Sequence, residues 1–230
     1  MKTVYEYGSP ASSSVLIQMV DDHDLDVIDN EVSLLQSLSG KDFHLLAVKV
    51  DCWNHDLSPW NAPAVFGSEA FGDGAEATLS EVLELMKDSE KNYFVGGYSL
   101  AGLFALWTVY QTDAFKGAAA ASPSVWFPGF LDYVKANDIR TQKVYLSLGD
   151  REDRTRNPIM ATVSDRIREM HDLLEEREVT CSLEWNPGTH FKDPDLRTAK
   201  AFSWLLHDSE IQKAGRYETG NNRPYPQIHC

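Results

Sequence analysis

Ser99 stands at the junction of a predicted strand and a predicted helix, where its hydroxyl is well placed to act as a nucleophile. The apolar run Tyr93–Tyr98 predicts the strand, and Leu100–Tyr110 predicts a strongly apolar helix. A serine on such a turn has a cramped backbone and needs small residues two positions to either side, which here are Gly97 and Ala101. The alternative is a serine that only caps the helix, but the strand before it and the helix after it favour the nucleophile.

Backbone N–H groups near Ser99 predict a site that stabilises an oxyanion. The first turn of a helix has N–H groups without partners, and that of Leu100 is expected beside the serine oxygen. A second donor is expected after the strand Val15–Val20, where Asp21 comes first. The acidic cluster at 21–24 could instead suggest a metal site. We prefer a solvated loop without a metal, because no second group of ligands accompanies it.

A serine hydroxyl is a weak nucleophile, so a base must activate it. Serines on this kind of turn are typical of the α/β-hydrolase fold, in which an acid and then a histidine follow along the chain. His190 fits that order, since it lies between the last predicted strand, Val179–Trp185, and the last predicted helix, Leu196–Leu206. The other six histidines precede the serine, lie within a predicted helix or follow the last strand: His23, His44, His55, His171, His207 and His229.

The acid is expected where the predicted strand Lys143–Leu148 ends, between the serine and His190. Three carboxylates compete there, on Asp150, Glu152 and Asp153. The acid orients the imidazole of the base, and several geometries can do this. The residues alone therefore leave the three candidates open.

Strand-like and helix-like segments alternate along the whole chain. The strand-like segments are 15–20, 43–50, 93–98, 116–122, 143–148 and 179–185. The helix-like segments are 26–38, 78–87, 100–110, 130–137, 158–176 and 196–206. This alternation predicts an α/β protein with a mainly parallel central sheet and helices on both faces. Neither a repeat nor a linker divides 1–206, so we expect one domain there and a polar tail over 207–230.

Charge and cysteine usage limit the partners and the compartment. The 230 residues carry a formal net charge of −14, whereas nucleic acids and anionic membranes attract basic surfaces, so we expect neither as a partner. The three cysteines form no CxxC pair, which disfavours structural zinc and a disulfide framework. Residues 1–6 lack the apolar core of a signal peptide, and no apolar run reaches membrane-spanning length. These features predict a cytoplasmic location.

Four segments, taken in order, resemble an esterase group of the α/β-hydrolases. The group includes esterase D-like enzymes, feruloyl esterases, mycolyltransferases and ferric-siderophore esterases. The segments are Gly97–Gly102, Ala121–Trp126, Gly149–Asp153 and Gly188–Phe191, and the resemblance covers about residues 13–206. It implies a single α/β-hydrolase domain that cleaves carboxylic esters through an acyl-enzyme intermediate, with no cofactor and with a small-molecule ester as its partner.

The resemblance also implies roles for single residues. Related enzymes commonly place the acid three residues after the turn glycine, here Gly149, which selects Glu152 beside Ser99 and His190. The chain departs from the group where Glu152 replaces the more common Asp and Ala101 replaces a glycine. A thioesterase or acyltransferase with the same triad is an alternative, and so is a catalytically silent binding protein on this scaffold. The oligomeric state stays open.

The loops expected around Ser99 predict the character of a substrate pocket. Trp53, Trp60 and Trp126, with Tyr98, could form an aromatic wall for an acyl or aryl group, or only cover core edges. Carboxylates in the two acidic loops give the mouth a negative charge, which three arginines at 151, 154 and 156 offset in part. We therefore expect neutral short-chain or aromatic esters to be preferred over anionic ones.

Overall fold

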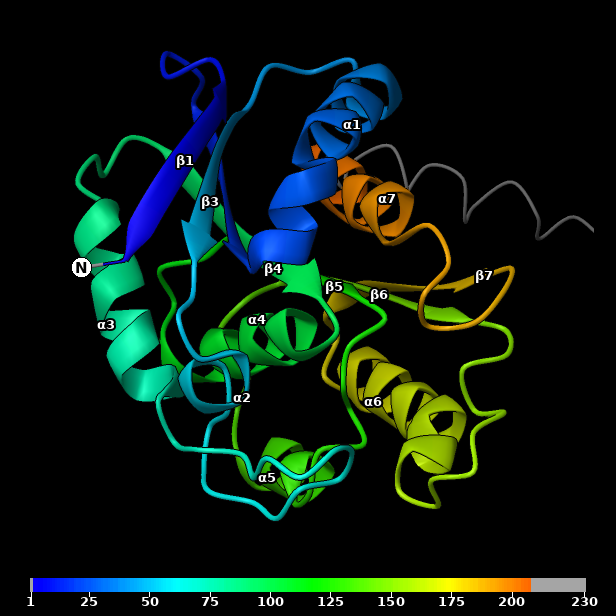
Figure 1. Cartoon of the computed structure of the whole chain (residues 1–230). Helices are drawn as coiled ribbons and strands as arrows, with labels where there is room; N and C mark the ends of the chain where they lie inside the picture. The colour runs from blue at the N-terminus through cyan, green and yellow to red at the C-terminus, as the bar shows by residue number, and fades with distance from the viewer. Residues whose placement is uncertain (1, 208–230) are drawn as a thin grey trace, which may run out of the picture.

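The sheet has seven strands, six of them parallel. A computed structural model describes residues 2–207 (Figure 1). The strand order across the sheet is β1-β3-β2-β4-β5-β6-β7, and only β1 runs antiparallel to its neighbour. The predicted α/β class with a mainly parallel sheet is confirmed. The strands are β1 Thr3–Gly8, β2 Ser14–Val20, β3 His44–Lys49, β4 Asn92–Tyr98, β5 Gly117–Ala121, β6 Lys143–Gly149 and β7 Thr180–Asn186.

Helices cover both faces of the sheet, as predicted. Helices α1 (Asp22–Ser39) and α7 (Pro194–Leu206) lie side by side on one face (Figure 1). The other face carries α3 (Ala75–Leu85), α4 (Leu100–Gln111) and α6 (Val163–Glu176). Two apolar clusters result, because successive side chains of a strand point to opposite faces. The shorter helices are α2 Trp53–Asp56 and α5 Phe130–Ala136, and a 3₁₀ turn covers Met160–Thr162.

Small residues at the centre of the sheet let α7 and α4 approach it closely. Strand β5 reads Gly-Ala-Ala-Ala-Ala and is fully buried between the two helices. A Cβ added at Gly96 of β4 would lie 2.6 Å from the ring of Phe202 in α7. A larger side chain at these positions would push α7 or α4 away from the sheet, according to the face to which it points.

The structure differs from the sequence prediction at several element ends. Strand β1 was not predicted, since its six residues are mostly exposed and lack an apolar run. Helix α1 begins at Asp22 and not at 26, because Asp21 caps it.

Of the predicted tail 207–230, only His207 lies within the described residues. Within residues 2–207, no helix has both the length and the apolar character needed to cross a membrane. The cytoplasmic location stays a prediction.

Glu31 is a carboxylic acid buried between α1 and the sheet. It is 3% exposed, and its Oε2 accepts a hydrogen bond of 3.3 Å from the side-chain amide of Gln18. Burial raises the pKa of Glu31 well above its ordinary value, against the hydrogen bond from Gln18, which lowers it. The folded protein therefore favours the protonated acid more than the unfolded chain does.

Glu31→Gln is expected to remove a pH-dependent loss of stability. A raised carboxyl pKa makes the free energy of unfolding fall as pH rises above the ordinary carboxyl range, and the amide does not titrate. The Tm of the variant should exceed that of the natural protein by a few degrees at about pH 8 and by much less at about pH 5. Thermal denaturation across this range measures the difference, with the exposed Glu76→Gln as control. A gap that is the same at every pH would contradict the prediction.

Candidate active site

Ser99 occupies a strained turn between β4 and α4. Its φ is 57° and its ψ −118°, a conformation that residues other than glycine rarely adopt. A Cβ added at Gly97 would lie 2.5 Å from the Cβ of Ala101, so only glycine fits there. Hydrogen bonds from Ser99 N–H to Ala121 (3.1 Å) and from Ser124 N–H to Ser99 (3.0 Å) hold the turn. Gly97 and Ala101 therefore lie as close together as the sequence pattern predicts.

The structure brings Ser99, His190 and Glu152 into one hydrogen-bonded chain. His190 Nε2 lies 3.0 Å from Ser99 Oγ, and His190 Nδ1 lies 2.7 Å from Glu152 Oε2. With the proton on Nδ1 held by the carboxylate, Nε2 can accept the proton of the serine hydroxyl. The three residues come from the turn after β4 and the loops after β6 and β7, which meet because the carboxyl ends of parallel strands share one edge.

Glu152 is buried, and both of its oxygens are occupied. Its side chain is 4% exposed, and Oε1 accepts from Gly149 N–H (2.7 Å), Ser122 Oγ (2.8 Å) and Arg197 Nη1 (2.7 Å). Burial by itself raises the pKa of this carboxyl, but the hydrogen bond and charge of His190 with the other donors hold it below the ordinary value. Glu152 therefore stays ionised beside the imidazole.

The N–H of Asp21, predicted as an oxyanion donor, is already bonded. It donates to Asp24 Oδ2 at 3.1 Å, while Asp24 N–H donates to Asp21 Oδ1 at 2.9 Å. The two aspartates form a capping box at the start of α1, which the spacing of three residues could have indicated. The hydrogen bonds of residues 2–207 include none from the N–H groups of Leu100, Asp22 or His23. The N–H of Leu100 therefore has no partner within the described residues, and its role as an oxyanion donor stays a prediction.

A pocket of about 240 Å³ opens beside Ser99. Two residues predicted to contact substrate, Trp53 and Tyr98, lie in its wall. Phe191 was not predicted there, although it directly follows His190. Its ring is 89% exposed and meets the imidazole edge-on, with ring centroids 5.5 Å apart. The lining consists of Asp21, His23, Asp24, Trp53, Tyr98, Ser99, His190, Phe191 and Pro194.

Solved structures with this arrangement of elements are known, although no family model and no curated protein matches the chain. An IroE-like serine hydrolase from Shewanella oneidensis has a TM-score of 0.69 at 17% identity, over 94% of this chain and 81% of that one. The siderophore hydrolase EstA from Aspergillus nidulans has a TM-score of 0.61 at 18% identity, over 85% of this chain and 84% of that one. A carboxylesterase from Bacillus cereus has a TM-score of 0.60 at 18% identity, over 90% of this chain and 95% of that one. The chain has the α/β-hydrolase fold. The resemblance found in the sequence is confirmed for the fold.

Two tryptophans predicted to bind substrate are not among the residues that line the pocket. Trp60 packs against the core and donates its Nε1–H to the carbonyl of Pro128 at 2.9 Å. Trp126 is 5% exposed and lies edge-on to Phe66. Both rings bury more apolar area in these positions than they would beside solvent, so packing decides where they lie.

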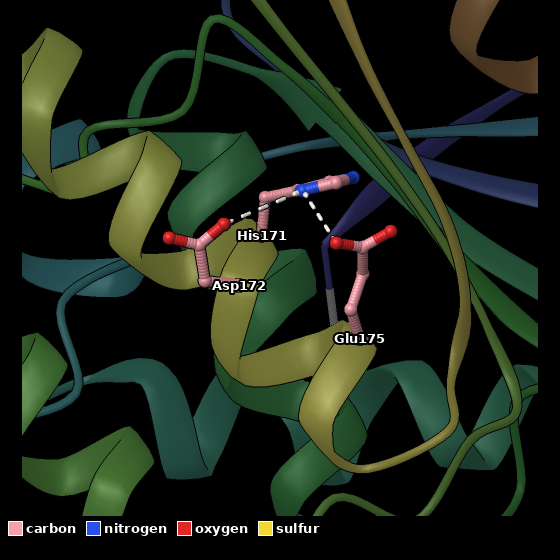
Figure 2. Close-up of side chains that lie close together, drawn as sticks. All are labelled: His171, Asp172 and Glu175. Carbon is pink, nitrogen blue, oxygen red and sulfur yellow. Dashed lines mark ion pairs between the residues drawn. The ribbon is translucent and has the colours of Figure 1, made fainter.

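One group of side chains within residues 2–207 lies close enough together to share a metal ion, on helix α6 (Figure 2). His171 Nδ1 is 3.8 Å from a carboxylate oxygen of Glu175 and 4.0 Å from one of Asp172. The two acids are exposed, and helical spacing alone places Glu175 one turn after His171. The group therefore shows an ordinary surface ion pair, with no second feature that points to a bound ion.

Glu152→Gln is expected to slow the reaction of Ser99 with a fluorophosphonate by about 10²- to 10⁴-fold, because the imidazole loses its counter-charge and its fixed orientation. Among the described residues, neither of the two competing acids makes a hydrogen bond to His190. Asp150 accepts from Gly188 N–H at 2.7 Å, and Asp153 Oδ1 is buried without a partner among the described residues. Asp150→Asn and Asp153→Asn should therefore change the rate less than about tenfold. A larger loss in either control than in Glu152→Gln would assign the acid to that residue.

Proposed function

We propose that the protein is a serine hydrolase that cleaves carboxylic esters through an acyl-enzyme intermediate. The observation that carries the proposal is the Ser99–His190–Glu152 chain, with contacts of 3.0 and 2.7 Å, at the wall of a pocket. The strained turn supports it, since backbone strain persists where the surrounding structure enforces it and gathers at functional sites. The solved neighbours, which include a serine hydrolase and a carboxylesterase, support hydrolysis over acyl transfer.

The reaction divides into two steps that use the same groups. Ser99 Oγ attacks the ester carbonyl while His190 Nε2 takes its proton, and the alcohol then leaves with that proton. A water molecule next attacks the acyl-enzyme with His190 as base, and the carboxylic acid leaves as Ser99 regains its proton. Glu152 stays ionised and stabilises the imidazolium that forms in each step.

The negative charge of the tetrahedral intermediate forms on the former carbonyl oxygen, which needs hydrogen-bond donors beside it. The unbonded N–H of Leu100 at the start of α4 is the first donor in this proposal. The second comes from the first turn of α1, where the N–H groups of Asp22 and His23 have no partner among the described residues. Both helix N-termini carry the partial positive charge that favours an oxyanion.

The function is tested by labelling and by turnover. A fluorophosphonate should modify the natural protein at Ser99, as mass spectrometry of peptides would show, and leave Ser99→Ala unmodified. Hydrolysis of p-nitrophenyl acetate or butyrate should fall at least about 10³-fold in Ser99→Ala. A folded natural protein that neither labels nor turns over would instead favour a binding protein on this scaffold. Faster cleavage of an acyl-CoA than of every ester would favour a thioesterase.

The pocket wall supports neutral over anionic esters as substrates. Asp21 and Asp24 lie in the wall beside the apolar groups of Trp53, Phe191 and Pro194. Burial raises the pKa of Asp24 to about 6, although the hydrogen bond from the N–H of Asp21 lowers it. Asp24 is therefore mostly charged above pH 7 and mostly neutral near pH 5.

Selection against anionic esters should accordingly weaken as the pH falls through about 6. We expect the ratio of kcat/KM for a neutral aryl ester to that for its carboxylate-bearing isostere to drop about two- to fivefold between pH 7.5 and 5.5, as Asp24 gains a proton. In Asp24→Asn the ratio should be low at both pH values. Any effect of pH that slows both substrates equally cancels in the ratio. A ratio that favours the anionic ester at low ionic strength and pH 7.5 would overturn the charge argument.

A further inference from the structure

Arg197 is a buried arginine that the sequence analysis did not single out. It lies in α7 on the face that packs against the sheet, and its side chain is 1% exposed. Arginine is almost never fully buried unless its guanidinium is paired, because removing the charge from water is costly. The pairing partners of this side chain therefore show what keeps it inside the protein.

The guanidinium contacts both the acid of the triad and the loop that carries its base. Nη1 lies 2.7 Å from Glu152 Oε1 and 3.0 Å from Ser122 Oγ. Nη2 donates to the carbonyl of Thr189 at 3.0 Å and to that of Pro187 at 3.3 Å. One rigid group thus fixes two loops that come from different strands.

Tyr98 closes these contacts into a ring. Its hydroxyl accepts from Arg197 Nη1 at 3.1 Å and donates to the carbonyl of His190 at 2.6 Å. The ring runs from Arg197 to Glu152, on to His190, and back through Tyr98. The residue directly before Ser99 is therefore tied to the base through the same arginine.

We propose that Arg197 is a positioning residue of the active site, which holds Glu152 and the loop before His190 in the one arrangement that brings the imidazole to Ser99. This inference rests on the proposed hydrolase function. The planar fork of arginine suits the task, because its two terminal nitrogens point at separate groups with fixed geometry. Lysine would carry the charge, but its donors all lie on one nitrogen, so it cannot reproduce the two separated nitrogens that reach the two loops.

The neighbouring glycine supports the same assignment. A Cβ added at Gly149 would lie 2.9 Å from Glu152 Oε1 and 3.0 Å from Arg197 Nη1. It would also lie 2.4 Å from the carbonyl of Gly188, in the loop of the base. The turn after β6 is thus shaped to let the arginine, the acid and that loop meet at one point.

A purely structural role for Arg197 makes a different prediction from a positioning role. If the side chain only anchors α7, its loss lowers stability and leaves turnover per folded molecule unchanged. If it positions the triad, kcat falls while KM changes little, because the acylation geometry is damaged more than the pocket. Loss of the cation should also move the acid limb of the kcat/KM profile to higher pH, since a positive charge 2.7 Å from Glu152 Oε1 no longer opposes protonation of that carboxylate.

The experiment compares Arg197→Met and Arg197→Lys with a matched control, Arg177→Met. Arg177 donates to the carbonyls of Val134, Lys135 and Asn137, and within residues 2–207 no hydrogen bond or ion pair joins it to Ser99, His190 or Glu152. Turnover of p-nitrophenyl butyrate, the pH profile and Tm are measured for each variant. We expect kcat to fall about 10²-fold in Arg197→Met and at least about tenfold in Arg197→Lys, with KM within about threefold and the acid limb displaced only in Arg197→Met. Arg177→Met, which removes a partly buried arginine away from the triad, should keep its kcat.

The proposal is overturned if Arg197→Met folds, whatever its loss of Tm, and keeps kcat within about threefold of the natural protein. Should Arg197→Met fail to fold, Arg197→Lys decides, since it retains the buried charge; full kcat in that variant would also overturn the proposal. Failure of the hydrolase function itself looks different, because the natural protein would then show neither labelling at Ser99 nor turnover.

Discussion

The carboxylate of Glu152 lies inside the protein, where an ionised group is costly unless its oxygens are paired. One oxygen faces the imidazole of His190, and the other takes three donors from the backbone and from two side chains. The positions of Gly149, Ser122 and Arg197 are therefore all set by this one buried charge. Without these donors the acid would take up a proton and could no longer balance an imidazolium.

The fold provides these donors because its parallel strands deliver several loops to one edge. The loops after β4, β5, β6 and β7 hold the nucleophile, Ser122, the acid and the base, respectively. Arg197 reaches them only because α7 lies close to the sheet, over the alanines of β5 and the glycine at position 96. The small residues at the centre of the sheet thus influence the geometry of a site at its edge.

The parts of the site that sequence reasoning could predict are those that depend on local geometry. A serine between a strand and an apolar helix has few conformations open to it, and the same turn requires small neighbours. Sequence reasoning could therefore predict the places of Ser99, Gly97 and Leu100. His190 followed from the order of elements along the chain. The acid stayed one of three candidates, because which carboxylate faces the imidazole depends on how the loop after β6 folds.

The parts that were missed depend on contacts between distant elements. An arginine in an amphipathic helix looks like a solvated residue, and nothing near Arg197 in the sequence shows that Glu152 lies beneath it. Trp60 and Trp126 lie in loops rich in turn residues, yet Trp126 packs into the core and Trp60 packs against it. Strand β1 is recognised only through its pairing with β3, since its own residues are mostly exposed. Asp21 looked like a free loop residue because the start of α1 was placed four residues too late.

The capping box at the start of α1 changes what the acidic residues of the pocket do. As loop residues, Asp21 and Asp24 would present full charges to a substrate. In the structure each carboxylate accepts a backbone N–H at the positive end of an 18-residue helix, which offsets part of its charge. Burial also favours the neutral form of Asp24. The pocket is therefore less negative than the net charge of −14 suggests, and selection against anionic groups rests on the ionisation of a few named carboxylates.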